Sequence, residues 1–445
     1  MKKFLNTLRN IWKIEDLKSR IINTVVLLLV YRLGSFVVLP GINPDALSSG
    51  STSGLFGLFD MFAGGAFSRA SIFALGIMPY ISASIVIQLL SVAVPMFQKM
   101  QKEGEDGRNK INQITRALTI IITLVQGVAY ITNLRNEQAA AIYNDGFGFM
   151  FTAIMVLIAG TMFTMWLGER ITDKGLGNGI SLIIMVGIIA RLPFGLAAEF
   201  SSRLNESGGG LIVFLVEIVM WLAVILAVIA LVQGTRKIPV QYAKRVVGRQ
   251  MVGGARSYVP MKVNAAGVMP IIFAQALLFI PGTIAQAFPN SDSATSGFLA
   301  NFMNPVSWSY NITTAVLIIL FTYFYTAITY SPNQIADDLK RNGGFIPGVK
   351  PGKQTSDFID NILSRITLPG SVFLAFVAIF PSIAMLFNIN NEFAQFYGGT
   401  SLLILVGVIL DTLQQVESHL LMRQYDGLLE GGAKIKGKAP AGMTM

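Results

Sequence analysis

The stretch "GLFDMFAGGAFSRASIFALGIMPY" (residues 57–80) begins as an apolar segment and is then interrupted by Gly64, Gly65 and Arg69. The apolar part is too short to cross a bilayer, because a hydrocarbon core about 30 Å thick requires roughly 20 apolar residues in succession. We interpret residues 55–68 as a half-helix that lies on the non-cytoplasmic side of the membrane. Irregular backbone at membrane depth is tolerated only where protein or a water-filled cavity covers it. The interruption therefore predicts a central cavity.

The composition of the whole chain is that of an integral membrane protein. Of its 445 residues, 53% are hydrophobic and only 13% are charged, and its mean hydropathy is +0.59. The absence of cysteine excludes disulfides and thiolate metal sites. The chain lacks an HExxH motif, and its acids Glu217 and Asp411 lie on different apolar runs, which argues against a membrane protease. We expect neither an enzyme nor a bound cofactor or metal.

The apolar runs are the strongest signal of fold class. Each is close to the length that spans a bilayer, so the sequence predicts an all-α polytopic membrane protein. We expect ten transmembrane helices, at residues 21–40, 71–95, 117–132, 149–167, 180–197, 210–232, 264–288, 309–330, 367–387 and 399–418.

Basic residues are distributed on one side of these spans. Of the 34 lysines and arginines, 29 lie in alternate loops and at the two termini. The positive-inside rule therefore places both termini in the cytoplasm. Five helices in each half would give two inverted halves around a central pore. The expected organisation is a cytoplasmic segment (1–20), an N-terminal half (21–205), a C-terminal half (206–420) and a cytoplasmic tail (421–445).

Two long cytoplasmic loops lie in the C-terminal half, at residues 234–262 and 331–366. The first contains seven basic residues and no acid, with Tyr242 and Tyr258 among them. Such a loop suits a polyanionic partner such as RNA, an acidic protein surface or anionic lipid headgroups, but a cluster that only fixes orientation has the same composition. In the second loop, glycine and proline alternate over residues 343–355, which predicts an ordered, projecting turn.

Glu217 lies within the apolar run "IVFLVEIVMW". An acid inside the membrane is a candidate proton or sodium site. A carboxyl group that is hydrogen-bonded within the helix bundle is the alternative. If ions bind at Glu217, the chain could instead be an ion-coupled secondary transporter with five-plus-five inverted repeats.

Long ordered stretches of the chain resemble the SecY family, the channel subunit of the bacterial protein translocase. The resemblance covers about residues 18–425, and the stretches that carry it are "SRASIFALGIMPYISASIVIQLL" (68–90), "GTMFTMWLGERITDKGLGNGISLI" (160–183), "KVNAAGVMPIIFA" (262–274), "SPNQIADDLKRNGGFIPGVKPGKQT" (331–355) and "YGGTSLLILVGVILD" (397–411).

The resemblance implies a protein-conducting channel in the bacterial cytoplasmic membrane. Such a channel passes unfolded secretory polypeptides across the membrane and releases hydrophobic segments sideways into lipid. The half-helix would then be a plug beneath an hourglass-shaped pore, and an apolar ring would exclude hydrated ions by dewetting. By resemblance, the plug includes Leu58, Phe59, Met61, Phe62, Gly64 and Gly65, and the ring consists of Ile77, Ile81, Ile180, Ile184, Ile272 and Ile404.

The resemblance also implies a lateral gate and a set of partners. The gate lies between the second and third spans on one side and the seventh and eighth on the other, with Ser82 and Gln126 at polar positions of the seam. The implied partners are the small membrane subunits SecE and SecG, the motor ATPase SecA, the translating ribosome, signal sequences of preproteins and membrane lipids. The implied docking residues are Arg236, Lys237, Tyr242, Lys244, Arg245, Arg249, Pro347, Gly348 and Lys350.

The chain departs from the family pattern at two positions. Lys350 stands where the family usually has arginine, and lysine keeps the charge but loses the bidentate hydrogen-bonding fork. No role in the family is implied for Glu217.

Overall fold

The computed structural model describes residues 14–47, 60–137, 139–143, 146–205, 210–242, 245–247, 250–252, 256–275, 277–278 and 306–433. Its helices are α2 (Glu15–Gly34), α4 (Met78–Ala93), α5 (Pro95–Lys102), α6 (Glu105–Glu137), α7 (Phe147–Lys174), α8 (Gly179–Asn205), α9 (Gly210–Gln233), α12 (Trp308–Thr329), α13 (Pro332–Arg341), α14 (Lys353–Leu386), α15 (Asn391–Ala394) and α16 (Gly399–Ala433). Short 3₁₀ helices cover Pro44–Ala46 and Ala139–Ala141. The strands are β1 (Thr235–Tyr242), β2 (Arg245–Val247), β3 (Gln250–Val252), β4 (Arg256–Lys262) and β5 (Gly344–Phe345).

The prediction of an all-α polytopic membrane protein is confirmed. Seven described helices are long and apolar enough to cross a membrane, and the count is eight if the bent pair α4 and α5 forms one span. Of the other two spans in the predicted set of ten, residues 21–34 of the first lie in α2. The other is 264–288, of which only 264–275 and 277–278 are described.

The second predicted span, 71–95, differs from the structure at both ends. Ser71 forms an isolated β-bridge with Val38, residues 72–77 form turns, and α4 begins only at Met78. At the other end, α4 and α5 meet at an angle of 102°. Val94, between them, has extended backbone angles because the ring of Pro95 disfavours the helical conformation in the residue before it. The long apolar run therefore hides two breaks that hydropathy does not detect.

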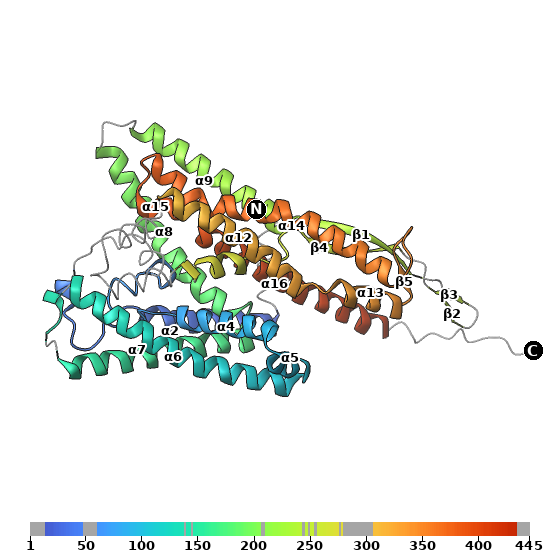
Figure 1. Cartoon of the computed structure of the whole chain (residues 1–445), viewed down its shortest axis with the longest axis horizontal. Coiled ribbons are helices and arrows are strands. Elements are labelled where there is room, and N and C mark those ends of the chain that lie inside the picture. The colour runs from blue at the N-terminus through green and yellow to red at the C-terminus, as the bar shows by residue number, and fades with distance from the viewer. Residues whose placement is uncertain are drawn as a thin grey trace, which may run out of the picture.

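The helices form two groups with α8 between them (Figure 1). One group contains α2, α4, α6 and α7, and the other contains α9, α12, α14 and α16. Each group has its own buried core, centred on residues such as Tyr130 and Leu157 in the first and Ile318 and Leu403 in the second. A third core lies between the groups and includes residues of α4, α8, α15 and α16.

The two long loops that the positive-inside pattern assigns to the cytoplasm form one small folded unit, which we call the small cytoplasmic unit after that assignment. Strand β1 pairs on one side with β4 of its own loop and on the other with β5 of the second loop, through Gln241 opposite Phe345 and Tyr242 opposite Gly344. Buried side chains join this sheet to α13 and the start of α14, namely Ile238, Val240, Met261, Leu339, Ile346, Ile359 and Leu363. This unit lies at the opposite end of the helix bundle from α15 (Figure 1).

Candidate functional site

The interrupted segment that follows α2 lies in the centre of the molecule. Within its described part, only residues 60–62 are helical, and residues 63–70 are turns. The half-helix predicted for 55–68 is therefore wrong for residues 63–68, because Gly64 and Gly65 have φ angles of 64° and 84°, which few residues other than glycine adopt. Leu58 and Phe59, which the sequence places in the plug, lie outside the described residues.

The segment is buried even though it is not helical. Met61, Phe62 and Phe67 are each less than one-tenth exposed. Its backbone touches α8 directly, since a Cβ atom added to Gly64 would lie 2.8 Å from Cα of Gly187. Gly64 of this segment and Gly187 of α8 therefore face each other, and this pairing allows the two backbones to approach.

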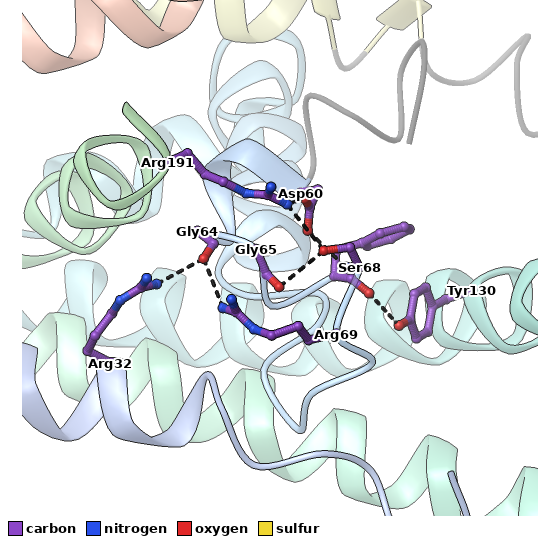
Figure 2. A network of polar contacts seen from close by, with 9 residues as sticks. Arg32, Asp60, Gly64, Gly65, Ser68, Arg69, Tyr130 and Arg191 are labelled. Atoms are coloured by element: carbon purple, nitrogen blue, oxygen red, sulfur yellow. Dashed lines mark hydrogen bonds and ion pairs between the residues drawn. The ribbon is translucent and has the colours of Figure 1, made fainter. Parts of the chain in front are cut away.

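Polar contacts hold this segment from several helices (Figure 2). The carboxylate of Asp60 forms an ion pair with Arg191 of α8 and accepts a hydrogen bond of 2.8 Å from the Ser68 amide. The carbonyl oxygen of Gly64 accepts hydrogen bonds from Arg32 of α2 at 2.9 Å and from Arg69 at 3.0 Å.

The outer edge of the segment is held by α6. The hydroxyl of Tyr130 donates a hydrogen bond of 2.8 Å to the carbonyl oxygen of Phe67, and the two rings meet edge to face. Arg191 also donates to the Ser68 hydroxyl at 3.2 Å. Side chains of three helices thus hold the segment, which we call the plug segment (residues 60–70).

Of the side chains that hold the plug segment, only Arg69 was named from the sequence, as an interruption of the apolar stretch, and no contact was assigned to it. Glu217 was interpreted as the one charge near the middle of a span, whereas Arg191 lies in the middle of α8 and Arg32 lies near the end of α2. Arg191 and Arg32 could have been identified from the sequence, because an ionisable residue inside an apolar run is costly in a membrane and therefore indicates a functional site.

The six isoleucines of the expected ring all belong to the central hydrophobic cluster. Ile77, Ile184 and Ile404 are among its buried members, and Ile81, Ile180 and Ile272 pack against it half-buried. They come from α4 and its start, α8, α16 and the helical residues 269–275. The same cluster contains Met61 and Phe62 of the plug segment. The structure therefore brings the six isoleucines expected in the ring together with two of the residues expected in the plug.

The residues expected at the lateral gate lie on neighbouring helices. Ser82 is on α4 and Gln126 is on α6, and these helices pack against each other. Both side chains are half-buried, and no hydrogen bond joins them in the described part of the chain. Because both belong to one side of the expected seam, they cannot bond to each other across it.

The expected docking residues lie in the small cytoplasmic unit as far as they are described. Arg236 and Lys237 are exposed on β1, and Tyr242 ends that strand beside β5. The turn with Pro347, Gly348 and Lys350 follows β5, and Gly348 has a φ of 85°. The Lys350 carbonyl accepts a hydrogen bond from Thr355, which orders this turn. Lys244 and Arg249 are outside the described residues, as is the side chain of Arg245.

Comparisons with known proteins identify the family. The SecY family model matches residues 71–413. "Protein translocase subunit SecY" of Halalkalibacterium halodurans is 44% identical, with 95% of this chain and 99% of the relative covered. The protein of the same name from Chlamydia trachomatis is 42% identical, with 95% and 98% covered.

Solved structures of low sequence identity share the fold. One is described as "the structure of a protein conducting channel"; it is 20% identical, with a TM-score of 0.66 over 90% of this chain and 92% of that chain. Another is "Sec61 in the Canine ribosome-channel complex from the endoplasmic reticulum", which is 18% identical, with a TM-score of 0.63 over the same shares of the two chains. The family match and the identity to curated relatives over almost the whole chain show that this chain belongs to the SecY family.

Proposed function

We propose that the chain is a protein-conducting channel that passes unfolded secretory polypeptides across the membrane and releases hydrophobic segments laterally into the bilayer. The observation that carries this proposal is the contact between a buried plug segment and a cluster of six isoleucines from four separate segments. The expected alternative, an ion-coupled transporter, is not supported, because the curated relatives are translocase subunits.

In the resting state, the isoleucines form the seal against ions. An apolar neck excludes hydrated ions because water gains few hydrogen bonds by entering it. Isoleucine also offers no hydrogen bond that would retain a particular sequence in transit. The plug segment then closes the neck from the non-cytoplasmic side and moves away when a polypeptide enters.

Lateral release requires a seam that opens at small cost. On one side of the seam are α4 and α6, and on the other are α12 and the span that contains Ile272. Ser82 and Gln126 place polar groups near this seam. Polar contacts between helices in a membrane contribute only about 0.6–2 kcal/mol each, so the hydrophobic core of a signal sequence can replace them.

The small cytoplasmic unit is the proposed docking surface for the partners that drive translocation. Its sheet presents Arg236, Lys237 and the turn with Lys350 on one folded body. The motor ATPase SecA and the translating ribosome would dock here in turn, and SecE and SecG would lie beside the spans. A ribosome-bound relative of the same fold supports the ribosomal partner. The basic loops and both termini would face the cytoplasm of a bacterium.

Reconstitution tests the proposed function. The chain would be placed in liposomes with SecE, SecG and SecA, and ATP-dependent protection of a preprotein from added protease would be followed. We expect protection that requires both ATP and the signal sequence of the preprotein. A preprotein without its signal sequence is the matched control. Protection that is absent with the intact preprotein, or equal for both, would contradict the proposal.

A further inference from the structure

Three charged side chains form a buried cluster that is distinct from the plug segment. Glu199 and Arg203 lie one turn apart on α8, and Glu217 lies on α9. Their side chains are 1%, 8% and 8% exposed, respectively. Arg203 donates to Glu199 at 2.8 Å and to Glu217 at 2.7 Å. Glu217 is therefore hydrogen-bonded within the bundle, as one of the two interpretations of the sequence held.

The cluster also holds the chain segment that joins α14 to α16. Arg203 donates a third hydrogen bond, of 2.9 Å, to the carbonyl oxygen of Asn388. The amide of Asn390 donates to the free oxygen of Glu199 at 2.7 Å. Asn388 has a φ of 58°, a conformation that asparagine tolerates better than most residues. We call residues 388–397 the seated segment. Its short helix α15 packs against α8 at this end of the bundle (Figure 1), and its Phe393 ring lies 6.0 Å from the ring of Trp221 on α9.

The hydrogen bonds around the cluster account for three of its four carboxylate oxygens. Glu199 uses both of its oxygens, and Glu217 uses Oε1 for the bond with Arg203. The second oxygen of Glu217, Oε2, is buried, and no hydrogen-bond partner reaches it from the described residues. Burial of a charged carboxylate oxygen without a hydrogen bond costs much free energy, whereas a protonated carboxyl group carries no charge to bury.

The described residues near the cluster do not provide a second cation. Helix α9 contains no charge other than Glu217, and Arg191, the nearest other cation of α8, is engaged with Asp60. From the seated segment, Glu392 adds a further negative charge, and the hydroxyl of Tyr397 is occupied by a 2.7 Å bond to the Glu217 carbonyl. Two carboxyl groups thus share one guanidinium, which leaves one negative charge uncompensated.

We propose that Glu199, Arg203 and Glu217 form a proton-binding site that holds one proton on the pair of carboxyl groups while residues 388–397 are seated. The proton balances the second carboxylate, so the closed cluster is neutral. When the proton leaves, the uncompensated charge must reach water. The hydrogen bond from Arg203 to the Asn388 carbonyl and the one from the Asn390 amide to Glu199 are then released. Proton binding and the seating of this segment are therefore linked.

Infrared spectroscopy of the full chain, reconstituted in lipid with its partner subunits and with isotope-labelled glutamate, tests the site directly. We expect the carbonyl band of a protonated glutamate at neutral pH, and its loss at alkaline pH. Both Glu217→Gln and Glu199→Gln should remove the band, because each leaves one carboxylate paired with Arg203. Glu169→Gln, which removes a glutamate paired with Arg116 on the surface, is the matched control and should keep it.

Hydrogen exchange gives a second measurement, because a cluster with only a structural role would give an opening constant that does not depend on pH. After correction for intrinsic exchange, the opening constant at the Asn390 amide should rise about tenfold per pH unit on the alkaline side in the unmodified chain. In Glu217→Gln, whose amide resembles the protonated acid, this rise should vanish. The proposal would be overturned if the unmodified chain shows no band of a protonated glutamate, or if the band survives in both variants. It would also be overturned if the opening constant at the Asn390 amide depends on pH equally in the unmodified chain and in Glu217→Gln.

Discussion

Replacement of Gly187 by alanine tests the closed position of the plug segment with a single methyl group. An added Cβ would lie 2.4 Å from the carbonyl oxygen of Phe62 and 3.1 Å from the amide nitrogen of Gly64. Since Cβ contacts under 3.0 Å are essentially never seen, the plug segment must retreat by about 0.6 Å, the difference between 3.0 and 2.4 Å. The atoms it meets belong to backbone, so no side-chain rotation relieves the clash.

The size of the effect follows from the cost of overpacking. Such clashes cost about 1–3 kcal/mol, which corresponds to a roughly 5- to 150-fold rise in the ratio of unplugged to plugged channels. Helix α8 itself gains, because alanine is favoured over glycine in a helix by about 1 kcal/mol. The plug should therefore loosen while the protein remains as stable as before.

Single-channel conductance in planar bilayers, without preprotein, measures this ratio. The open probability of Gly187→Ala should rise within that range, with an unchanged melting temperature. Gly127→Ala is the matched control, since its Cβ would meet only a side-chain carbon of Leu157 at an ordinary 3.7 Å. If the two variants conduct alike, or if Gly187→Ala stays as closed as the unmodified chain, the closed position inferred for the plug segment is refuted.

Three further changes probe other parts of the channel. Asp60→Asn removes the charge that pairs with Arg191, and because charge-assisted hydrogen bonds contribute about 1.5–3 kcal/mol, resting conductance should rise at least about tenfold; unchanged conductance would show that the ion pair does not hold the plug. Changing Ile81 and Ile272 together to asparagine should wet the neck, so that ions leak and preproteins with defective signal sequences are exported; no change in either measurement would remove these residues from the seal. Charge reversal at Lys244 and Arg245 should weaken ribosome or SecA binding and reduce its salt dependence; an unchanged salt slope would leave the loop with an orienting role only.

The distribution of basic residues along the sequence indicates functional positions as well as the orientation of the chain. The positive-inside pattern assigns 29 of 34 basic residues to the cytoplasmic side, and the remaining five are Arg32, Arg69, Arg135, Arg191 and Arg203. Arg32 and Arg191 contact the plug segment, and Arg69 lies within it and donates to its Gly64 carbonyl. Arg203 forms the carboxylate cluster. Since a charge is costly inside a membrane, these exceptions mark functional candidates. The pairing of Asp60 with Arg191 could not be read, because it depends on how distant segments pack.

The cytoplasmic unit shows a second limit of sequence reasoning. Each loop was predicted separately, one as a basic loop and the other as an ordered turn. The sheet arises because Tyr242 of one loop pairs with Gly344 of the other, and backbone pairing between distant strands leaves no local pattern. The long spans, by contrast, follow directly from runs of apolar residues, since length and hydropathy alone decide whether a segment can cross a bilayer.

The plug segment and the isoleucine cluster are held by different kinds of interaction, and this difference explains how a tight seal can open. Three of the six polar contacts described for the plug segment end on backbone carbonyls, those of Gly64 and Phe67. Water can replace each of these three bonds once the segment leaves, so they add little to the cost of release, and the ion pair of Asp60 with Arg191 is the main polar contact to be broken. The isoleucine side chains gain nothing from water and close instead around an apolar or extended chain that enters. If the isoleucine cluster is the seal that we propose, the barrier to ions persists during translocation although the plug segment has moved.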